Sequence, residues 1–147
     1  MTRTLIRNAT LVTMDAARGA MPFQGDILIE DGRIAAIGEG LAAAPGADVI
    51  DGRNRLVMPG LVNAHTHGHG TLAKGQGDRW TLELLLNAGP WLGSGRLLED
   101  KYLSAQLNAV EMVRKGCTAA YDLYVEFPTP TVEGMLAVAK AYSDVGM

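Results

Sequence analysis

Three histidines crowd into one short segment, and this segment constrains the fold more than any other part of the chain. His65, His67 and His69 are the only histidines among 147 residues. Residues 61–64 before them are mostly apolar and lead into glycine-rich sequence, as a buried strand does where it opens into a loop. In a strand, residues i and i+2 point to the same face, with Cα atoms roughly 6.5 to 7 Å apart. The pattern therefore predicts a strand that presents His65 and His67 together.

Two imidazoles on one face of a strand can bind a single metal ion. Imidazole suits zinc and other first-row transition metals, among them iron. We therefore predict that His65 and His67 are metal ligands, with zinc as the first choice and iron as the alternative. A histidine pair can also lie in a core and hydrogen-bond to a carbonyl. The sequence around the pair is therefore needed to choose between metal ligands and core histidines.

Length and composition limit the class of protein. The chain of 147 residues can form a domain core, but it is shorter than the roughly 250 residues of a complete (β/α)8 barrel. Its net charge is −3 and it has no basic stripe, so neither nucleic acid nor an anionic membrane is expected as a partner. No apolar run approaches membrane-spanning length, and polar residues interrupt any signal-peptide core. The single cysteine, Cys117, is expected to be a buried structural thiol in a reducing cytoplasm.

Residues 1–58 are predicted to form a small β-domain, because short β-rich runs alternate there with turns. Asp31-Gly32 lies between two hydrophobic runs and predicts a hairpin, since that turn needs positive φ. Asp51-Gly52 marks a second turn.

Residues 59–147 are predicted to alternate strands and helices in an α/β arrangement. Helical spacing and capping glycines favour a helix over 99–115 ended by Gly116, and another over 131–145 ended by Gly146. Between them a strand is expected over 117–124, which implies parallel pairing in a βαβ unit. The remaining expectations are a loop over 71–77 and a short amphipathic helix over 78–86, ended by 87–90, in which Trp80 and the leucines pack.

These segments resemble the N-terminal part of the amidohydrolase superfamily, the metal-dependent hydrolases and deaminases. The run PGLVNAHTHGHG is similar to the signature of that family's first barrel strand, and the strands before it resemble the family's N-terminal β-domain. Three features resemble the branch that contains cytosine deaminase, guanine deaminase and the triazine chlorohydrolases. They are the spacing in HTHGHGTLAKG, the long helix ending in VRKG, and the strand GCTAAYDLY.

The resemblance implies a fold and an activity. Residues 59–147 would be the first two β/α units of a TIM barrel, preceded by a composite β-sandwich-like domain over 1–58, with the chain truncated after the second unit. The activity implied is hydrolysis of carbon-nitrogen bonds other than peptide bonds, as in deamination of a cyclic amidine or another small heterocyclic substrate by metal-bound hydroxide. The resemblance also implies a cytoplasmic homo-oligomer.

The same resemblance assigns roles to individual residues. His65 and His67 correspond to the first two metal ligands, whereas the remaining ligands and the proton-transferring aspartate belong to later strands, so no catalytic residue is expected here and the chain alone is expected to be inactive. The substrate-binding candidates are His69, Gln76 and Asp78.

Asp122 and Glu126 are carboxylates that could be mistaken for further ligands. An aspartate at the position of Asp122 is structural in the resembling branch and fixes neighbouring loops, and Glu126 is the weaker candidate of the two.

Two other functional classes stay open at this point. The chain could belong to a cyclic amidase or dipeptidase of the same superfamily, although the T-x-x-x-D-hydrophobic-Y pattern of the second strand argues against it. It could also be a non-catalytic scaffold with the same fold, which the intact His65 and His67 disfavour.

Overall fold

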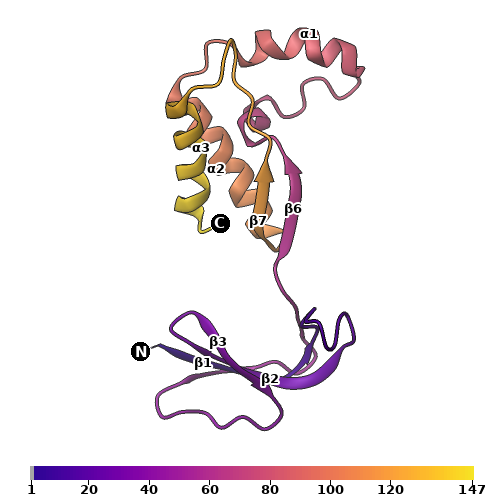
Figure 1. The fold of residues 1–147 in the computed structure, drawn as a ribbon, viewed down its shortest axis with the longest axis vertical. Helices are drawn as coiled ribbons and strands as arrows, with labels where there is room; N and C mark the ends of the chain where they lie inside the picture. The colour runs from indigo at the N-terminus through magenta and orange to yellow at the C-terminus, as the bar shows by residue number, and fades with distance from the viewer. Residues whose placement is uncertain (1) are drawn as a thin grey trace. The chain divides into compact units, whose positions relative to one another are not determined.

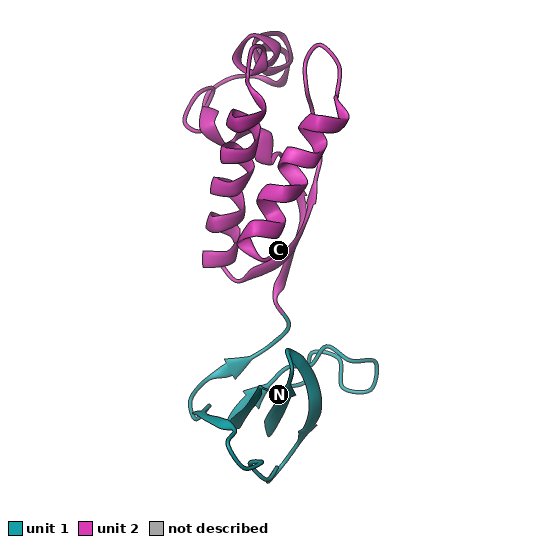
Figure 2. Ribbon diagram, turned by 90° about the vertical axis from the view of Figure 1, so that its left-hand side faces the viewer, with its two compact units in different colours: residues 1–59 teal, residues 60–147 magenta. Residues whose placement is uncertain are grey.

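The computed structural model describes residues 2–147, and the chain divides into two compact units. Unit 1 covers residues 1–59 and unit 2 covers residues 60–147, as the two colours of Figure 2 show. Each unit has its own strands and its own core, so each is described by itself.

Unit 1 is built on one five-stranded sheet. Its strands are β1 (Arg3–Leu11), β2 (Phe23–Glu30), β3 (Arg33–Gly38), β4 (Asp48–Asp51) and β5 (Leu56–Val57). The order is β3-β2-β1-β4, and β5 also pairs with β1. The β1–β2 and β2–β3 pairs are antiparallel, whereas β4 and β5 run parallel to β1. The described residues of this unit hold this single sheet, so the β-sandwich stays a prediction.

The hairpin predicted at Asp31-Gly32 is confirmed. These residues join β2 to β3 with φ values of 47° and 76°, and Glu30 pairs with Arg33 across the turn. Two consecutive positive φ values match the right-handed twist of the strands that the turn connects.

A buried carboxylate supports the irregular part of unit 1. The pairing of β1 with β2 shifts register between Ile6 and Ala9, and Asn8 has a φ of 57°. The side chain of Asp26 accepts the N–H of Asn8 on Oδ1 and the N–H of Leu41 on Oδ2, both at 2.9 Å. The hydrogen bond from Asn8 holds the pKa of Asp26 below its ordinary value. The carboxylate thus satisfies the N–H of Asn8 at the bulge and the N–H of Leu41 in the segment after β3.

Unit 2 alternates strands and helices around a parallel strand pair (Figure 1). In chain order its elements are β6 (Leu61–Thr66), the 3-10 helix η1 (Gly68–Ala73), α1 (Leu82–Gly93), α2 (Leu98–Arg114), β7 (Cys117–Asp122) and α3 (Val132–Val145). Strands β6 and β7 are parallel, with Leu61 opposite Cys117 and Thr66 opposite Asp122. The predicted βαβ arrangement and α/β class are therefore confirmed. Among residues 2–147, no helix has both the length and the apolar character needed to cross a membrane.

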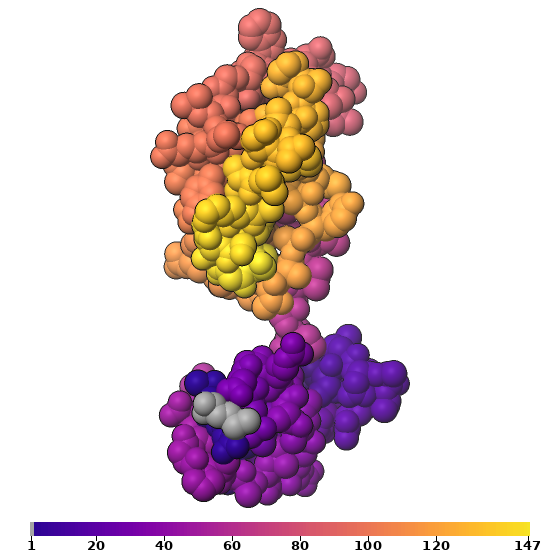
Figure 3. Space-filling view, turned by 60° about the vertical axis from the view of Figure 1, so that its left-hand side comes forward, coloured from indigo at the N-terminus to yellow at the C-terminus, as the bar shows by residue number. Residues whose placement is uncertain are grey.

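Helices α2 and α3 pack closely because the residues between them are small. In the cluster between the two helices, Ala105 and Ala141 are fully buried and Val138 is 5% exposed. Small side chains let two helix backbones approach each other. The outer side of α3, yellow in Figure 3, lies on the surface beside residues of α2. Gly116 follows α2 with a φ of 85°, and Gly146 caps α3 with a φ of 91°, as predicted.

The segment between β6 and α2 was predicted least well. The expected loop over 71–77 begins inside η1, and the expected helix over 78–86 is instead α1, which starts after its cap Thr81 and continues through Pro90. A proline removes one N–H bond, but here the carbonyl of Pro90 still accepts the N–H of Ser94 at 2.7 Å, so the helix closes after it.

The packing expected of three side chains is only partly found. Trp80 lies against Gly77, where an added Cβ would come within 2.9 Å of the indole. Leu86, on α1, is 67% exposed, and no residue of that helix is fully buried. Cys117 is half-buried rather than buried, since it lies at the start of β7 in a sheet of only two strands.

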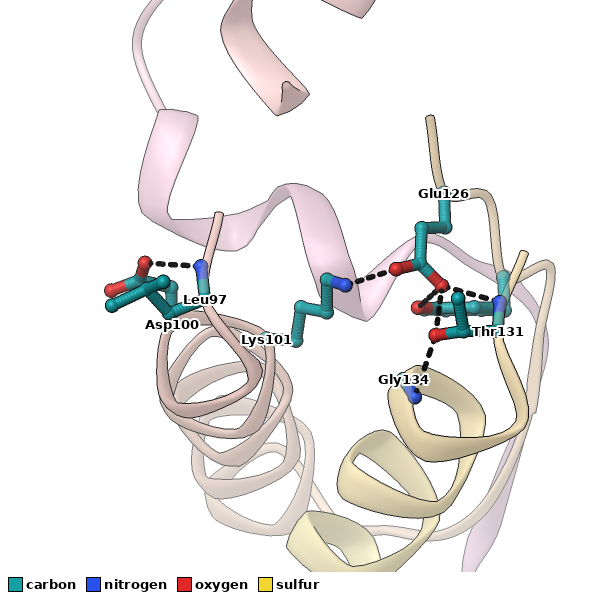
Figure 4. A network of polar contacts seen from close by, with 7 residues as sticks. Leu97, Asp100, Lys101, Glu126, Thr131 and Gly134 are labelled. Atoms are coloured by element: carbon teal, nitrogen blue, oxygen red, sulfur yellow. Dashed lines mark hydrogen bonds and ion pairs between the residues drawn. The ribbon is translucent and has the colours of Figure 1, made fainter. Parts of the chain in front are cut away.

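A polar cluster connects α2, the end of β7 and the start of α3 (Figure 4). Glu126 forms an ion pair with Lys101 of α2, and the two side chains are 8% and 12% exposed. Its Oε2 accepts hydrogen bonds from the hydroxyl of Tyr124 at 2.8 Å and from the N–H and hydroxyl of Thr131 at 2.7 and 2.8 Å. The Thr131 hydroxyl in turn accepts the N–H of Gly134 at the N-terminus of α3. Both Glu126 oxygens are therefore engaged within the protein, which makes Glu126 a structural residue.

We predict that Asp26→Asn destabilises the protein by about 2 kcal/mol, because one acceptor oxygen becomes a donor that faces a backbone N–H in a buried site. The measurement is urea unfolding of the full-length protein near pH 7. Asp48→Asn, at an exposed position in β4, is the matched control and is expected to change the free energy of unfolding by less than about 0.5 kcal/mol. Equal effects of the two substitutions would contradict the role given to Asp26.

Glu126 is predicted to make stability depend on pH. The ion pair with Lys101 and the hydrogen bond from the Thr131 N–H lower its pKa from 4.5 to about 2. A carboxyl with a lowered folded-state pKa contributes stability above its unfolded-state pKa and loses it as pH falls. Glu126→Gln is therefore expected to lower the free energy of unfolding near pH 7, and its difference from the wild type should shrink between pH 4.5 and about 2.

The matched control for this pH series is Glu111→Gln. Glu111 pairs with Lys74 at 2.6 Å, but those side chains are 35% and 63% exposed, so solvent screens the pair. The control should change stability much less than Glu126→Gln. A difference between Glu126→Gln and the wild type that stays constant with pH would argue against the buried ion pair.

Candidate metal centre

The imidazoles of His65 and His67 converge at the carboxyl end of β6. Their Nε2 atoms are 3.2 Å apart, and the ring planes are nearly perpendicular at 75°. A tetrahedral zinc ion with Zn–N distances of about 2.0–2.1 Å holds two nitrogens roughly 3.3 Å apart. Both side chains are exposed, so an ion could reach them. The pair therefore has the spacing that a shared zinc ion requires.

The backbone fixes the tautomer of His67. Its Nδ1 lies 2.8 Å from the carbonyl oxygen of Leu123. A carbonyl can only accept, so Nδ1 carries the proton and the lone pair of Nε2 is free for a metal. Leu123 also donates its own N–H to the carbonyl of Thr66 at 2.8 Å, which ties the end of β7 to the end of β6.

His69 lies beside these two imidazoles without joining them as a third ligand. Its ring centroid is 5.7 Å from that of His67 and 5.8 Å from that of Tyr124, with edge-to-face geometry in both pairs. Its Nδ1 is buried and has no hydrogen-bond partner within residues 2–147. Burial lowers the pKa of His69 even though the nearby Asp122 carboxylate acts to raise it, so the ring is neutral near pH 7.

Gln76 and Asp78 are the predicted substrate-binding residues that the structure does not bring to the imidazoles. Both are exposed in the segment between η1 and α1. In the part of the chain that the structure describes, neither forms a hydrogen bond or ion pair with His65, His67 or His69. Their role stays a prediction.

Asp122 anchors the backbone that follows His67. Its Oδ2 accepts the N–H of Gly68 at 3.1 Å and the hydroxyl of Tyr142 at 2.6 Å. This is the structural role expected of it. No group of three histidine, cysteine, aspartate or glutamate side chains within residues 2–147 is arranged to hold a metal. Catalytic zinc normally has three protein ligands plus water, so His65 and His67 alone would not complete such a site.

Sequence reasoning missed the helix residues that hold the backbone of η1. Ser104 is fully buried in α2, and its hydroxyl lies 2.8 Å from the carbonyl of Gly68 and 2.9 Å from that of His69. It also accepts the N–H of Leu72 at 3.2 Å, and Arg96 donates to the carbonyl of His69. The one available signal was a serine on the apolar face of a predicted helix, where a buried hydroxyl needs partners.

Two sequence relatives carry the names of deaminases. The chain is 40% identical over 122 residues to 5′-deoxyadenosine deaminase of Methanosarcina barkeri, which covers 82% of this chain and 28% of the relative. It is 35% identical over 151 residues to 5-methylthioadenosine/S-adenosylhomocysteine deaminase of Desulforamulus reducens, which covers 100% of this chain and 33% of the relative. The chain thus spans about a third of the length of the relatives it matches.

Two solved structures are similar to this chain in fold. A triazine hydrolase from Arthrobacter aurescens superposes with a TM-score of 0.82 at 28% identity, covering 100% of this chain and 34% of the hydrolase. An adenosine deaminase from Xanthomonas campestris, solved with bound zinc, superposes with a TM-score of 0.80 at 25% identity, covering 97% of this chain and 32% of the deaminase.

The family assignment agrees with the resemblance read from the sequence. The sequence model of the amidohydrolase family matches residues 56–147, which include the whole of unit 2 and both convergent imidazoles. The matched part contains the strand, helix and strand that were predicted from the sequence, now β6, α2 and β7. The chain therefore belongs to the amidohydrolase family.

Proposed function

We propose that this chain forms the N-terminal part of a zinc-dependent aminohydrolase that deaminates an adenosine-type nucleoside. The observation that carries the proposal is the 3.2 Å separation of the His65 and His67 Nε2 atoms at the carboxyl end of β6. The names of the relatives, which are deaminases of adenosine derivatives, support the substrate class. The zinc bound in the deaminase of similar fold supports the choice of metal over iron.

The residues of this chain would hold and orient the metal. His65 and His67 would each give one Nε2 lone pair, and the Leu123 carbonyl keeps the proton of His67 on Nδ1. Bound zinc would supply the Lewis acidity that makes water a nucleophile near neutral pH. The net reaction exchanges the exocyclic amino group for oxygen and releases ammonia. The proton-transferring group would come from strands that follow β7 in barrels of this type.

The substrate would lie against the segment that follows β6. His69 would face the heterocycle as a neutral imidazole, which can donate or accept a hydrogen bond without placing a charge beside the purine. Gln76 and Asp78 would reach the substrate from the exposed segment after η1.

The proposed architecture places residues 59–147 as the first two β/α units of a TIM barrel and residues 1–58 as part of a β-sandwich. Exposed apolar side chains on the two-strand sheet favour the presence of further strands that would cover them. Val62 on β6 is 68% exposed and Tyr121 on β7 is 65% exposed. We propose that the complete enzyme is a cytoplasmic homo-oligomer.

We predict that the full-length protein binds zinc and releases ammonia from an adenosine derivative, and that His65→Ala and His67→Ala abolish both. A metal that supplies several kcal/mol to the transition state makes its loss cost about a thousandfold or more in kcat/KM. Metal content is measured by elemental mass spectrometry, and ammonia release is measured with 5′-deoxyadenosine and 5-methylthioadenosine as substrates.

His69→Ala is the matched control within the same motif. It should keep the zinc content of the wild type and raise KM, because His69 is assigned to substrate and not to metal. Zinc binding without ammonia release, together with hydrolysis of a cyclic amide, would replace the deaminase by a cyclic amidase. A wild-type protein without bound metal would support the alternative of a non-catalytic scaffold with the same fold.

A further inference from the structure

The end of β7 holds residues 66–68, the metal-ligand segment, through two backbone contacts and one contact to the His67 side chain. Leu123 donates its N–H to the Thr66 carbonyl and accepts Nδ1–H of His67, each at 2.8 Å. Asp122 accepts the N–H of Gly68 at 3.1 Å. Residues 66–68 are therefore positioned by two consecutive residues of the neighbouring strand.

Two side chains from the helices hold these contacts in turn. Tyr142 of α3 donates its hydroxyl to Asp122 Oδ2 at 2.6 Å. Asn108 of α2 donates from Nδ2 to the hydroxyl oxygens of Thr66 at 3.0 Å and Tyr142 at 3.1 Å. Helices α2 and α3 pack side by side over the strand pair (Figure 1), so one polar chain runs from both helices to the metal-ligand segment.

We propose that Tyr142 and Asn108 are positioning residues for the metal centre, and that they act by fixing the backbone of residues 66–68. The inference rests on the proposed function, since it concerns the ion that His65 and His67 would share. Within residues 2–147, neither side chain forms a hydrogen bond or a ring contact with an imidazole. Their effect on metal binding passes through Thr66, Asp122 and the backbone. Loss of the Tyr142 hydroxyl or of the Asn108 side chain should therefore weaken metal affinity more than it lowers the stability of the metal-free protein.

The space around Gly68 leaves the backbone little freedom. A Cβ at this position would come 2.5 Å from the Tyr142 hydroxyl oxygen and 2.6 Å from Asp122 Oδ2. The glycine backbone thus packs directly on the tyrosine–aspartate pair. Because His67 is the preceding residue, a shift of this pair moves the backbone that carries the imidazole.

The Asp122 carboxylate depends on Tyr142 for its place. Its Oδ1 is buried and has no partner within residues 2–147, so Oδ2 makes both of its hydrogen bonds. Burial and the hydrogen bond to Asp122 raise the pKa of Tyr142, so the phenol stays protonated and donates. Without the phenol, one hydrogen bond from Gly68 would hold a buried charge, which favours rearrangement.

The test compares Tyr142→Phe with Tyr102→Phe in the full-length protein. Tyr102 is a matched control because its hydroxyl also donates to an aspartate, Asp144, at 2.8 Å, but at the exposed side of α2 and α3. Zinc affinity is measured by competition with a chelator, and the visible spectrum of the cobalt-substituted protein reports ligand geometry. Thermal unfolding of the metal-free protein measures folding separately.

Outer partners of metal-bound histidines affect metal affinity by about 10- to 100-fold. Tyr142→Phe should therefore lower zinc affinity by about tenfold and shift the cobalt spectrum, while Tyr102→Phe stays within about twofold of the wild type. Equal zinc affinities for Tyr142→Phe and the wild type would overturn the inference, even if Tyr142→Phe unfolds at a lower temperature.

Asn108→Ala provides a second variant if Tyr142→Phe does not fold, with the same expected loss of zinc affinity and the same overturning result. A wild-type protein that binds no zinc would reject the proposed function, and the inference with it. A wild-type protein that binds zinc as tightly as Tyr142→Phe and Asn108→Ala would reject the inference alone.

Discussion

The parallel pairing of β6 with β7 is the constraint on which the rest of unit 2 depends. Parallel strands bring their carboxyl ends to the same edge, and the register puts Thr66 opposite Asp122. This register aims the Leu123 carbonyl at His67 and the Asp122 carboxylate at Gly68. A slip by one residue would turn alternate side chains to the opposite face and separate these groups. The geometry of the imidazole pair is therefore a property of the strand pair and not of the histidine motif alone.

Elements with local signals could be predicted from the sequence. The turn at Asp31-Gly32 and the helix ends at Gly116 and Gly146 depend on residues that accept positive φ, and those residues stand at the positions concerned. In the segment 68–93, Gly75 and Gly77 also have positive φ, at 85° and 82°, but no local signal marked η1 or the full length of α1. The 3-10 helix η1 forms over Ser104, whose hydroxyl lies within 3.2 Å of three backbone groups from a distant part of the chain. Because Ser104 lies more than 30 positions away in the sequence, the residues around position 70 could not predict this contact.

In the candidate site too, residues with a local signal could be predicted, whereas residues placed by long-range contacts could not. The i, i+2 spacing of His65 and His67 was enough to predict their convergence, because strand geometry fixes it. Asn108 and Tyr142 look like ordinary helix positions in the sequence, since the contacts of Asn108 reach residues 42 and 34 positions away. Glu126 likewise gained its role from Lys101, 25 residues earlier. Long-range polar contacts depend on packing, which no local pattern encodes.

Apolar and polar contacts occupy different parts of unit 2. The buried residues between α2 and α3 are apolar, namely Ala105, Val138 and Ala141, and the rings of Tyr102, Tyr124 and Tyr142 pack against them. Next to residues 66–69 the contacts are polar instead, with Ser104, Asn108, Asp122 and Tyr142 hydrogen-bonded to each other or to the backbone. Apolar side chains of equal volume would stabilise a fold at least as well as a buried polar cluster. Hydrogen bonds, unlike apolar contacts, depend on direction, so this cluster specifies one backbone conformation for residues 66–69. The proposed metal centre would require such a fixed backbone, because the Nε2 atoms of His65 and His67 would have to stay 3.2 Å apart while other ligands came from elsewhere.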